Sequence, residues 1–394
     1  MGSFSFCFGI IFIDGLSDYL YYFLKRSAKI IDSSASGTTF KEVSGAVVSQ
    51  IKTPLPPLAE QKRIVSKVDE LMALCDQLES QTEASIEAHQ LLVKTLLETL
   101  TNAKDADELN DSWQRISEHF DVLFTTEDSI DQLKQTILQL AVMGKLVKQD
   151  PNDEPASELL RKIATEKAKL IKEGKIKKQK PLPPVSEGEK LFELPEGWEW
   201  CRFQSLFYDL KYGTSKRSDY TIAGAPVLRI PNVVKGYIDS VDLKFTKLND
   251  NEFRDLSLKE NDILVIRSNG SSSIVGSSAV VDKRHEKFAY AGYLVRVRLD
   301  NDLYNSKFIQ LVLRARLIRE QIETPLRTTS GVKNINSTEI SRLIMPCVPF
   351  EQQKRIVAKV DELMSYCDTL KVHIHAAQSA QFQLADAIAG RGID

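Results

Sequence analysis

The sequence predicts an α+β protein that combines a mixed α/β domain with two long helices running antiparallel to each other. Three observations support this class. A 25-residue segment occurs twice, at 54–78 and 346–370, with 16 identical aligned positions. Both copies space their apolar residues as a helix does. Between the copies, from about residue 195, the pattern changes to short β-rich runs, which is typical of a mixed globular domain.

Each copy of the repeated segment begins with prolines, which end an extended stretch, and continues as a long helical pattern. Apolar residues recur at spacings of four, three, four and three, the pattern of a helix that packs along another helix. A helix over 59–100 would be about 60 Å long and could not bury such a seam alone. We therefore predict that the copies pack against each other through Ile64, Val68, Leu71, Cys75 and Leu78 of the first and Ile356, Val360, Leu363, Cys367 and Leu370 of the second.

The similarity between the two halves extends upstream of the prolines. The order strand, helix and polar loop is expected at 4–13, 17–31 and 32–43, and again at 289–299, 305–322 and 324–335. The apolar stretch at the N-terminus is too short to span a bilayer, so we interpret it as a buried strand rather than a signal or membrane segment. The chain is therefore predicted to begin within the last part of a first repeat unit.

The stretch between the repeats is expected to contain two more helices before the β-rich domain. An amphipathic pattern predicts a helix over 126–147, and 148–194 reads as a charged helix followed by a Pro/Lys linker. Within it, 161–180 holds nine cations and two acids. We interpret this run as a solvated helix and linker, with sliding contact to DNA phosphates as the alternative. Strands are expected at 225–233, 262–270, 274–281 and 289–299.

Charge is unevenly distributed, although the net charge is only −2. Residues 1–150 carry about −8, residues 151–345 about +7 and the remainder about −1. A basic middle region favours a polyanionic partner for that region, and the near-neutral total argues against a general nucleic-acid coat. The five cysteines are far apart and form no CxxC pair, so neither structural zinc nor a disulfide framework is expected, and a reducing cytoplasm fits.

Catalytic motifs are missing from the sequence. There is no GxxxxGK[ST] loop and no glycine fingerprint for a nucleotide cofactor. The Pro-Pro pairs at 56–57 and 183–184 are not preceded by Asn or Asp, as they are in base methyltransferases. No spaced acidic pair with a following Lys suggests a nuclease, and the five histidines are scattered. We expect a non-catalytic protein with no cofactor and no metal site.

Three polar, basic stretches lie within the β-rich domain. Arg and Asn side chains can bond guanine and adenine edges with two hydrogen bonds, whereas Lys, Ser and Thr hold phosphates. The alternative is three ordinary polar surface loops. The candidate DNA-binding residues are Lys211, Tyr212, Thr214, Ser215, Lys216 and Arg217; Arg267, Ser268, Asn269 and Ser271; and Arg327, Thr328, Thr329, Ser330, Lys333 and Asn334.

The order of the segments resembles that of the specificity subunit of a type I restriction-modification system. The signature is a proline-ended variable domain, a helix with the pattern EQKRIVxKVDELMxxCDxL, a second variable domain and the same helix again. The segments QLAVMGKLVKQDPNDEPASELL and ELPEGWEW are similar to the linker and domain entry of the same family. The resemblance covers essentially the whole chain.

This resemblance implies two target-recognition domains at opposite ends of a pair of antiparallel conserved helices. Each domain would read one half of a split sequence in double-stranded DNA, with the helices fixing the gap. The helices would also dock methyltransferase subunits, and restriction subunits would join that complex. The family's specificity subunit has no catalytic residues. No membrane partner is implied, whereas a self-dimer through the conserved helices is a further possibility.

The resemblance also implies a division into five segments, with one departure from the family pattern. They are a remnant of the first recognition domain at 1–53, a conserved helical region at 54–147, the linker at 148–194, the second recognition domain at 195–345 and a conserved C-terminal helix at 346–394. Complete members carry two full recognition domains. The alternative function is therefore a truncated, non-recognising or decoy subunit that only binds the methyltransferase.

Overall fold

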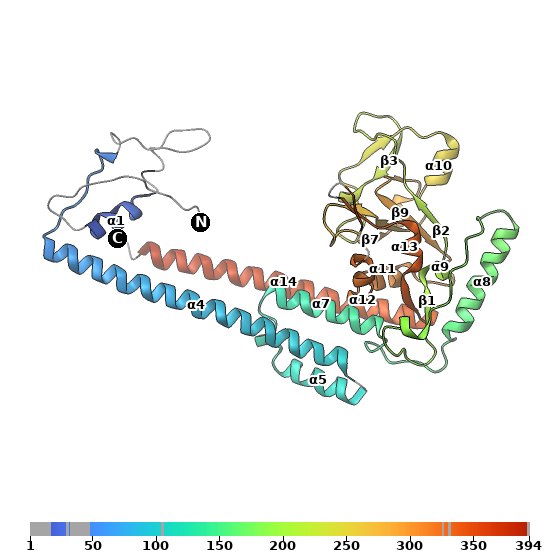
Figure 1. Cartoon of the computed structure of the whole chain (residues 1–394), viewed down its shortest axis with the longest axis horizontal. Coiled ribbons are helices and arrows are strands. Elements are labelled where there is room, and N and C mark those ends of the chain that lie inside the picture. The colour runs from blue at the N-terminus through green and yellow to red at the C-terminus, as the bar shows by residue number, and fades with distance from the viewer. Residues whose placement is uncertain are drawn as a thin grey trace. The chain divides into compact units, whose positions relative to one another are not determined.

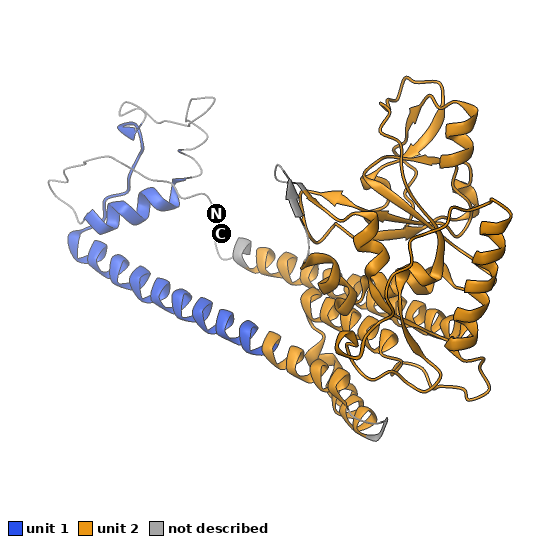
Figure 2. Cartoon of the chain, turned by 45° about the vertical axis from the view of Figure 1, so that its right-hand side comes forward, with its two compact units in different colours: residues 1–89 blue, residues 90–394 orange. Residues whose placement is uncertain are grey.

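The computed structural model describes residues 17–28, 31, 48–103, 106–324, 327–329 and 332–391. The strand expected at 4–13 and the loop expected at 32–43 lie outside the described residues. The chain divides into two compact units, residues 1–89 and 90–394, and the boundary falls within one long helix (Figure 2). No helix in the described parts of the chain is long and apolar enough to cross a membrane.

The first unit contains helix α1 (Ser17–Arg26) and the first part of α4 (Leu58–Asn102). Helix α4 has 45 residues, which confirms the long helix predicted over 59–100. The hydroxyl of Tyr19 donates to the carbonyl oxygen of Pro54 at 3.0 Å, and that of Tyr22 donates to the carboxylate of Asp69. These bonds hold α1 against the start of α4. Helix α1 is shorter than the predicted 17–31, because it ends at Arg26.

The second unit holds a set of helices and a β-rich domain (Figure 1). Its helices after α4 are α5 (Ala106–Glu118), α6 (Phe120–Leu123), α7 (Glu127–Val142), α8 (Ala156–Lys172), α9 (Phe203–Leu206), α10 (Asp250–Leu256), α11 (Ser306–Arg314), α12 (Arg316–Glu323), α13 (Ser337–Arg342) and α14 (Phe350–Arg391). Short 3₁₀ helices are η1 (Glu187–Glu189), η2 (Ile230–Asn232) and η3 (Lys283–His285). The strands are β1 (Glu199–Arg202), β2 (Phe207–Tyr212), β3 (Ala225–Leu228), β4 (Lys244–Thr246), β5 (Ile263–Ile266), β6 (Ser268–Asn269), β7 (Ser278–Val280), β8 (Ala289–Tyr290), β9 (Leu294–Leu299), β10 (Arg327–Thr329), β11 (Val332–Asn334) and β12 (Ile344–Cys347).

The β-rich domain is closed by its own ends, because β1 pairs antiparallel with β12 in the register Glu199↔Cys347 to Arg202↔Ile344. Its central sheet has the order β2-β9-β5-β7, and a smaller sheet has the order β4-β3-β8 with β3 parallel to β8. Strand β5 is buried along its whole length, as expected for a strand covered on both faces. A further sheet has the order β10-β11-β6. The mixed α+β class predicted from the sequence is confirmed.

Several element boundaries differ from those predicted. The single helix expected at 305–322 is two helices, because Ala315 is extended and fully buried, and the turn there aims the apolar faces of α11 and α12 at one core. The strand expected at 225–233 ends at Leu228, and Pro231, which has no N–H for a ladder, lies in η2. The polar loop expected at 324–335 contains β10 and β11, and the single strand expected at 262–270 is two short strands, β5 and β6.

Helix α7 confirms that an amphipathic helix lies within 126–147, but it ends at Val142, before the predicted end at Val147. Its start is capped by Thr126, whose hydroxyl accepts a hydrogen bond from the Ser129 amide at 3.1 Å. Its end is followed by Gly144 at φ +73°, where an added Cβ would collide with Pro195. Only glycine adopts this left-handed conformation without strain. The cap and the glycine therefore set the two ends of α7.

The long helix α14 packs along α7 in the opposite direction (Figure 1). Lys371 pairs with Asp131 at 2.6 Å and His375 with Glu127 at 3.1 Å, while Asp368 pairs with Lys134. Since the partners on α14 descend as those on α7 ascend, the two helices are antiparallel. The seam positions of the second copy lie in this contact region: Ile356, Val360 and Cys367 are buried, and Leu363 and Leu370 pack against the same core.

The first copy of the seam is covered much less. Leu71, Cys75 and Leu78 of α4 are exposed, although the residue types equal those of the second copy. Ile64 and Val68, near α1, are half-buried. The predicted pairing between the two copies would join the two units of the chain, and it stays a prediction.

Candidate nucleic-acid interface

Parts of the three basic stretches meet at one edge of the β-rich domain. Strand β11 pairs antiparallel with β6, so that Lys333 lies opposite Asn269 and Asn334 opposite Ser268. Strand β10 extends this sheet on the other side of β11. The first stretch joins through Tyr212, whose ring lies under the guanidinium of Arg267 at 4.8 Å from the ring centroid. Segments more than 50 residues apart in sequence thus form one surface, which we call the β6–β11 edge.

Arg267 is held inside this surface instead of projecting from it. Its side chain is half-buried, and Nη1 donates to the carbonyl oxygen of Gly292 at 3.3 Å. Its backbone amide donates to the carbonyl oxygen of Tyr293 at 2.9 Å. The Tyr212 hydroxyl accepts a hydrogen bond from the Ser337 amide at 2.7 Å. Because its guanidinium is engaged by Tyr212 and Gly292, Arg267 is better placed to position the end of β2 than to read a base.

A tight backbone contact fixes the loop beside Tyr212. An added Cβ at Gly213 would collide with the carbonyl oxygens of Tyr290 and Ala291, so this position requires glycine. The Thr214 amide donates to the Tyr290 carbonyl at 2.9 Å. Burial raises the pKa of Tyr290, which keeps its hydroxyl protonated, and it donates to the Lys211 carbonyl at 3.2 Å. These contacts bind the end of β2 to the turn between β8 and β9.

That turn carries a candidate residue that the sequence analysis missed. Tyr293 is 61% exposed and adjoins Gly292, which contacts the Arg267 side chain. An exposed tyrosine beside cations can stack on or pack against a base. The sequence feature that could have indicated Tyr293 is the dipeptide Gly-Tyr between two strands of a basic domain. Such a dipeptide is typical of a turn with an exposed aromatic residue.

The remaining cations of the first stretch are already paired within the domain. Lys211 pairs with Asp255 at 2.9 Å, Lys216 with Glu252 at 2.6 Å, and Arg217 with Asp219 at 3.5 Å. Thr214 uses its hydroxyl to accept from the Lys216 amide at 3.1 Å, and Ser215 is exposed. Two of these acidic partners belong to α10, so Lys211 and Lys216 are directed toward that helix.

The second and third stretches are more available to a ligand. Asn269 accepts a hydrogen bond from the Ser271 amide at 2.9 Å through Oδ1, which leaves its amide nitrogen as a donor. Lys333 forms no ion pair within the described residues. Ser268 is buried, and the Ser271 and Ser273 hydroxyls lie 2.8 Å apart. Ser330 lies outside the described residues, and only the backbone of Arg327, Thr328 and Thr329 is described.

Buried ion pairs make the support under this edge rigid. Arg298 of β9 donates to both carboxylate oxygens of Asp262, at 2.6 and 2.5 Å, with Asp262 almost fully buried. Arg296 pairs with Asp209 of β2 and donates from Nη1 to the Asp255 carbonyl at 3.1 Å. A bidentate pair such as Arg298–Asp262 holds one geometry. The contacts of Arg296 connect β9 to β2 and α10.

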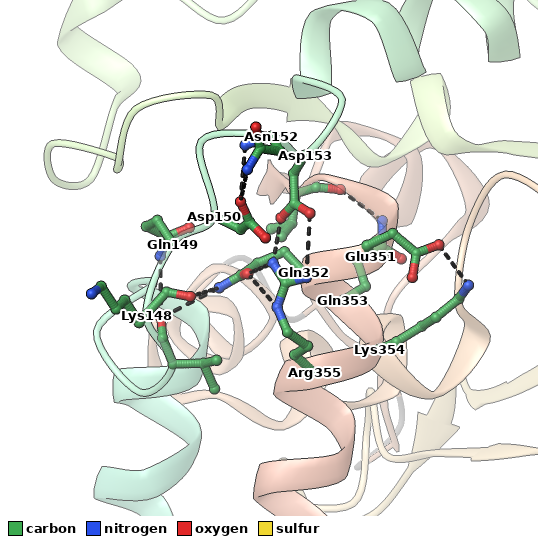
Figure 3. A network of polar contacts seen from close by, with 12 residues as sticks. Lys148, Gln149, Asp150, Asn152, Asp153, Glu351, Gln352, Gln353, Lys354 and Arg355 are labelled. Atoms are coloured by element: carbon green, nitrogen blue, oxygen red, sulfur yellow. Dashed lines mark hydrogen bonds and ion pairs between the residues drawn. The ribbon is translucent and has the colours of Figure 1, made fainter.

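A second polar network ties α14 to the chain that leads into α8 (Figure 3). Arg355 donates to both carboxylate oxygens of Asp153, and this bonding raises the pKa of Arg355. Arg355 Nε donates to Gln352 at 3.0 Å, and Gln352 donates to the Val147 carbonyl at 3.3 Å. Gln353 donates to the Val348 carbonyl at 2.7 Å. In the second copy, the EQQKRIV sequence at 351–357 therefore anchors the first turn of the long helix.

The first copy reproduces part of this arrangement. Gln61 donates to the Pro56 carbonyl at 2.8 Å, the equivalent of the bond from Gln353. The carboxylate of Asp69 accepts a hydrogen bond from the hydroxyl of Tyr22 in α1. The carboxylate of the equivalent Asp361 lies 3.9 Å from the Nζ atom of Lys307 in α11. In each copy, the helix upstream of the prolines thus contacts the same aspartate. The local structure supports the repeat seen in the sequence.

Comparisons with known proteins give a consistent result. Residues 5–88 match the family model described as the type I restriction modification DNA specificity domain. The specificity subunit of the Escherichia coli type I restriction enzyme EcoAI is 45% identical over 343 residues, which cover 86% of this chain and 58% of that protein. The EcoEI specificity subunit of the same species is 41% identical over 362 residues, covering 88% and 59%.

A solved structure concerned with complex assembly of the type I R-M system contains a similar chain, with a TM-score of 0.48, 16% identity, and coverage of 95% of this chain and 70% of that one. The present chain spans less than two thirds of the length of the EcoAI and EcoEI subunits. With 45% identity sustained over 86% of its residues, the chain belongs to the family of type I restriction-modification DNA specificity subunits.

Proposed function

We propose that this chain is a DNA sequence-recognition subunit of a type I restriction-modification complex, and that the domain closed by β1 and β12 contacts the DNA. The observation that carries the proposal is the β6–β11 edge, where Lys333 lies opposite Asn269 and the exposed Tyr293 accepts a backbone hydrogen bond from Arg267. The proposal also draws on family membership. Because the chain spans 58% of the length of the EcoAI subunit, DNA recognition is proposed for it and not transferred from that protein.

The chemistry of the β6–β11 edge suggests which residues would contact bases, which would contact phosphates and which position the edge. The free amide nitrogen of Asn269 suits an acceptor on a base edge, and the ammonium group of Lys333 suits a phosphate. Tyr212 and Arg267 hold each other and thereby position the edge. The short strands β6 and β11 present Asn269 and Lys333 opposite each other, so the two contacts would be made to neighbouring nucleotides.

The protein partners follow from the family. We propose that methyltransferase subunits dock on the helices that contain the repeated segment, and that restriction subunits join this complex. The chain itself would be non-catalytic and would act in the cytoplasm. We further propose the segment boundaries 1–53, 54–147, 148–194, 195–345 and 346–394, with 195–345 as the DNA-binding domain.

Fluorescence anisotropy of labelled duplex DNA tests the DNA-binding part. Six to ten phosphate contacts would lower the affinity about 10³–10⁵-fold between 50 and 200 mM salt. Lys333→Ala should weaken binding to all duplexes and reduce the salt slope by about one unit, whereas Lys283→Ala, an exposed lysine elsewhere in the domain, serves as the control. Salt-independent binding, or methyl transfer by the purified chain alone, would contradict the proposal.

A second function has one observation in its favour. Three of the candidate cations, Lys211, Lys216 and Arg217, are already neutralised by acidic side chains. This favours a subunit that captures the methyltransferase without reading DNA. Sequencing of methylated sites in cells that carry the complex separates the two functions, because a decoy subunit would leave no defined methylated motif.

A further inference from the structure

Two lysines of the first basic stretch are held by the short helix α10, which lies in the β-rich domain (Figure 1). Lys211 lies opposite Arg296 in the pairing of β2 with β9, and its ammonium group pairs with Asp255 at 2.9 Å. Lys216 pairs with Glu252 at 2.6 Å. The four side chains of these two pairs are between 34% and 68% exposed. Because exposed ion pairs contribute little to stability, both pairs are open to exchange with another ligand.

Further hydrogen bonds fix the positions of the two acids. Glu252 also accepts a hydrogen bond from the Asn249 amide at 2.8 Å, as part of the capping box at the start of α10. The backbone of Asp255 is held by Arg296, which donates to the Asp255 carbonyl oxygen at 3.1 Å. A lysine, in contrast, carries its charge at the end of a flexible four-carbon chain. The two lysines can therefore leave their partners by rotation of their own side chains, without movement of α10.

A third lysine, from the linker, lies close to the same acids. The pKa of Asp255 is lowered by the hydrogen bond from Lys211 and also by the charges of Arg296 and Lys177. Lys177 is exposed, and it forms no ion pair within the part of the chain that the structure describes. Three lysines thus lie near two carboxylates, and the group as a whole keeps a positive charge. A surface of this kind attracts a polyanion.

The group of three lysines is separate from the β6–β11 edge, although both adjoin the end of β2. Neighbouring side chains of a strand point to opposite faces of its sheet, so Lys211 points away from Tyr212, whose ring contacts Arg267. The β6–β11 edge carries an amide and an aromatic ring that can contact bases. The lysine group carries only ammonium groups, which suit phosphates and hold no sequence information.

We propose that Lys177, Lys211 and Lys216 form a phosphate-binding surface for duplex DNA, and that Glu252 and Asp255 mask it. The two carboxylates occupy two of the lysines in the free protein. A DNA backbone at the end of β2 replaces them, because each phosphate contact also releases a counterion from the DNA. The mask lowers the affinity for duplexes of any sequence. The inference rests on the proposed function for its ligand, and goes beyond it by giving α10 a regulatory role.

Fluorescence anisotropy of the full chain with a labelled duplex of random sequence tests the mask. Glu252→Gln with Asp255→Asn removes both charges, keeps the side-chain sizes and leaves an oxygen for the capping box. This unmasked variant should bind about tenfold more tightly at low salt, the size expected when two exposed ion pairs no longer compete. Its affinity should also fall more steeply with salt, by about two units of logarithmic slope, one for each released lysine. Lys177→Gln in the native chain should reduce the slope by about one unit.

Two further variants separate a mask from a general effect of charge. Asp250→Asn with Glu260→Gln also removes two exposed acids from this region, but neither forms an ion pair among the described residues. This control should raise the affinity by about twofold or less and leave the salt slope unchanged, because unpaired surface charges are screened. Adding Lys211→Gln and Lys216→Gln to the unmasked variant should return both affinity and slope to the native values. Circular dichroism shows whether each variant keeps the native secondary structure.

Four results would overturn the inference. They are an unmasked variant that binds no more tightly than the native chain, an equal gain in the control variant, a gain that survives the loss of both lysines, or an unchanged slope for Lys177→Gln. A failure of the DNA-binding site proposed at the β6–β11 edge looks different. Lys333→Ala would then leave the affinity of the native chain unchanged, whatever the unmasked variant does. Absence of binding by both the native and the unmasked chain would contradict both proposals.

Discussion

Arg355 holds the carboxylate of Asp153 through two hydrogen bonds and so ties the first turn of α14 to the loop between α7 and α8. Asp153 is largely buried in this pair. Among the residues that the structure describes, the equivalent arginine of the first copy, Arg63, pairs only with Glu60 of its own helix, and its side chain is 76% exposed. The same residue in the same motif therefore has a structural role in one copy that it lacks in the other.

This contrast gives a stability prediction with an internal control. Arg355→Ala should lower the free energy of unfolding by about 1–3 kcal/mol, because it leaves a buried carboxylate without its partner. Arg63→Ala should change it by less than about 0.5 kcal/mol. Urea denaturation of both variants measures the difference. Equal losses would mean that Asp153 finds another partner or that Arg63 is covered in solution.

The contact between Arg267 and Tyr212 predicts a positioning role. Arg267→Lys keeps the charge but loses the planar contact with the ring, so the free energy of unfolding should fall by about 0.5–1 kcal/mol. The affinity for cognate and random DNA should fall by a similar factor, because the whole edge loosens. Thermal unfolding and DNA anisotropy are measured on the same preparation. Loss of cognate affinity alone, at unchanged stability, would make Arg267 a direct base reader.

Asn269 provides the sharper test of base reading. Asn269→Asp keeps the oxygen that accepts from the Ser271 amide and replaces only the donating nitrogen. Affinity for the cognate site should drop by about 1–3 kcal/mol more than affinity for random duplex DNA. Asn269→Ser, which shortens the side chain without adding charge, controls for repulsion from phosphates. A uniform loss on all DNA for both variants would remove Asn269 from the list of base readers.

The lowered pKa of Glu189 predicts that the folded protein loses stability in acid. Hydrogen bonds from the Ser186 amide, from the Arg202 guanidinium and from the Ser186 hydroxyl lower the pKa of Glu189 to about 2. Because its pKa is lower in the folded state, its contribution is fully present above the unfolded pKa near 4.5 and is lost as the pH falls toward 2. Urea denaturation at pH 6 and pH 3.5 should show a smaller decrease for Glu189→Gln than for the native chain. Identical pH profiles would show that the carboxylate is not held in solution.

The two cysteines of the seam predict different thiol reactivity. Cys75 is exposed, whereas Cys367 is buried and burial raises its pKa, so a maleimide should label Cys75 rapidly and Cys367 slowly. Mass spectrometry after a short exposure identifies the labelled sites, with Cys75→Ser as the control. Labelling of Cys367 at the rate of Cys75 would show that α14 does not stay packed on α7.

Local sequence patterns were enough to predict the long helices and much of their ends. Helix α4 follows from apolar spacing and the preceding prolines, and α7 follows from its amphipathic pattern, although α7 ends at Val142 and not at the predicted Val147. The repeated segment was also found from the sequence alone. In both copies, the structure shows a glutamine side chain that donates to the carbonyl oxygen five residues earlier. The β-rich class of the middle domain was predicted too, although β10 and β11 were expected to be part of a polar loop.

The sequence by itself determined the α+β class, the repeat, the basic domain and three candidate stretches, because these depend on composition and local periodicity. Only the tertiary structure decided how the stretches combine. The fold brings β11 next to β6, so that the two strands pair. It also places Tyr212 and the Gly292 carbonyl where they contact the Arg267 guanidinium, so this side chain lies against the domain. The same holds for the repeat. Identical residues are buried on α14 and exposed on α4, since burial depends on what packs against a helix and not on the helix alone.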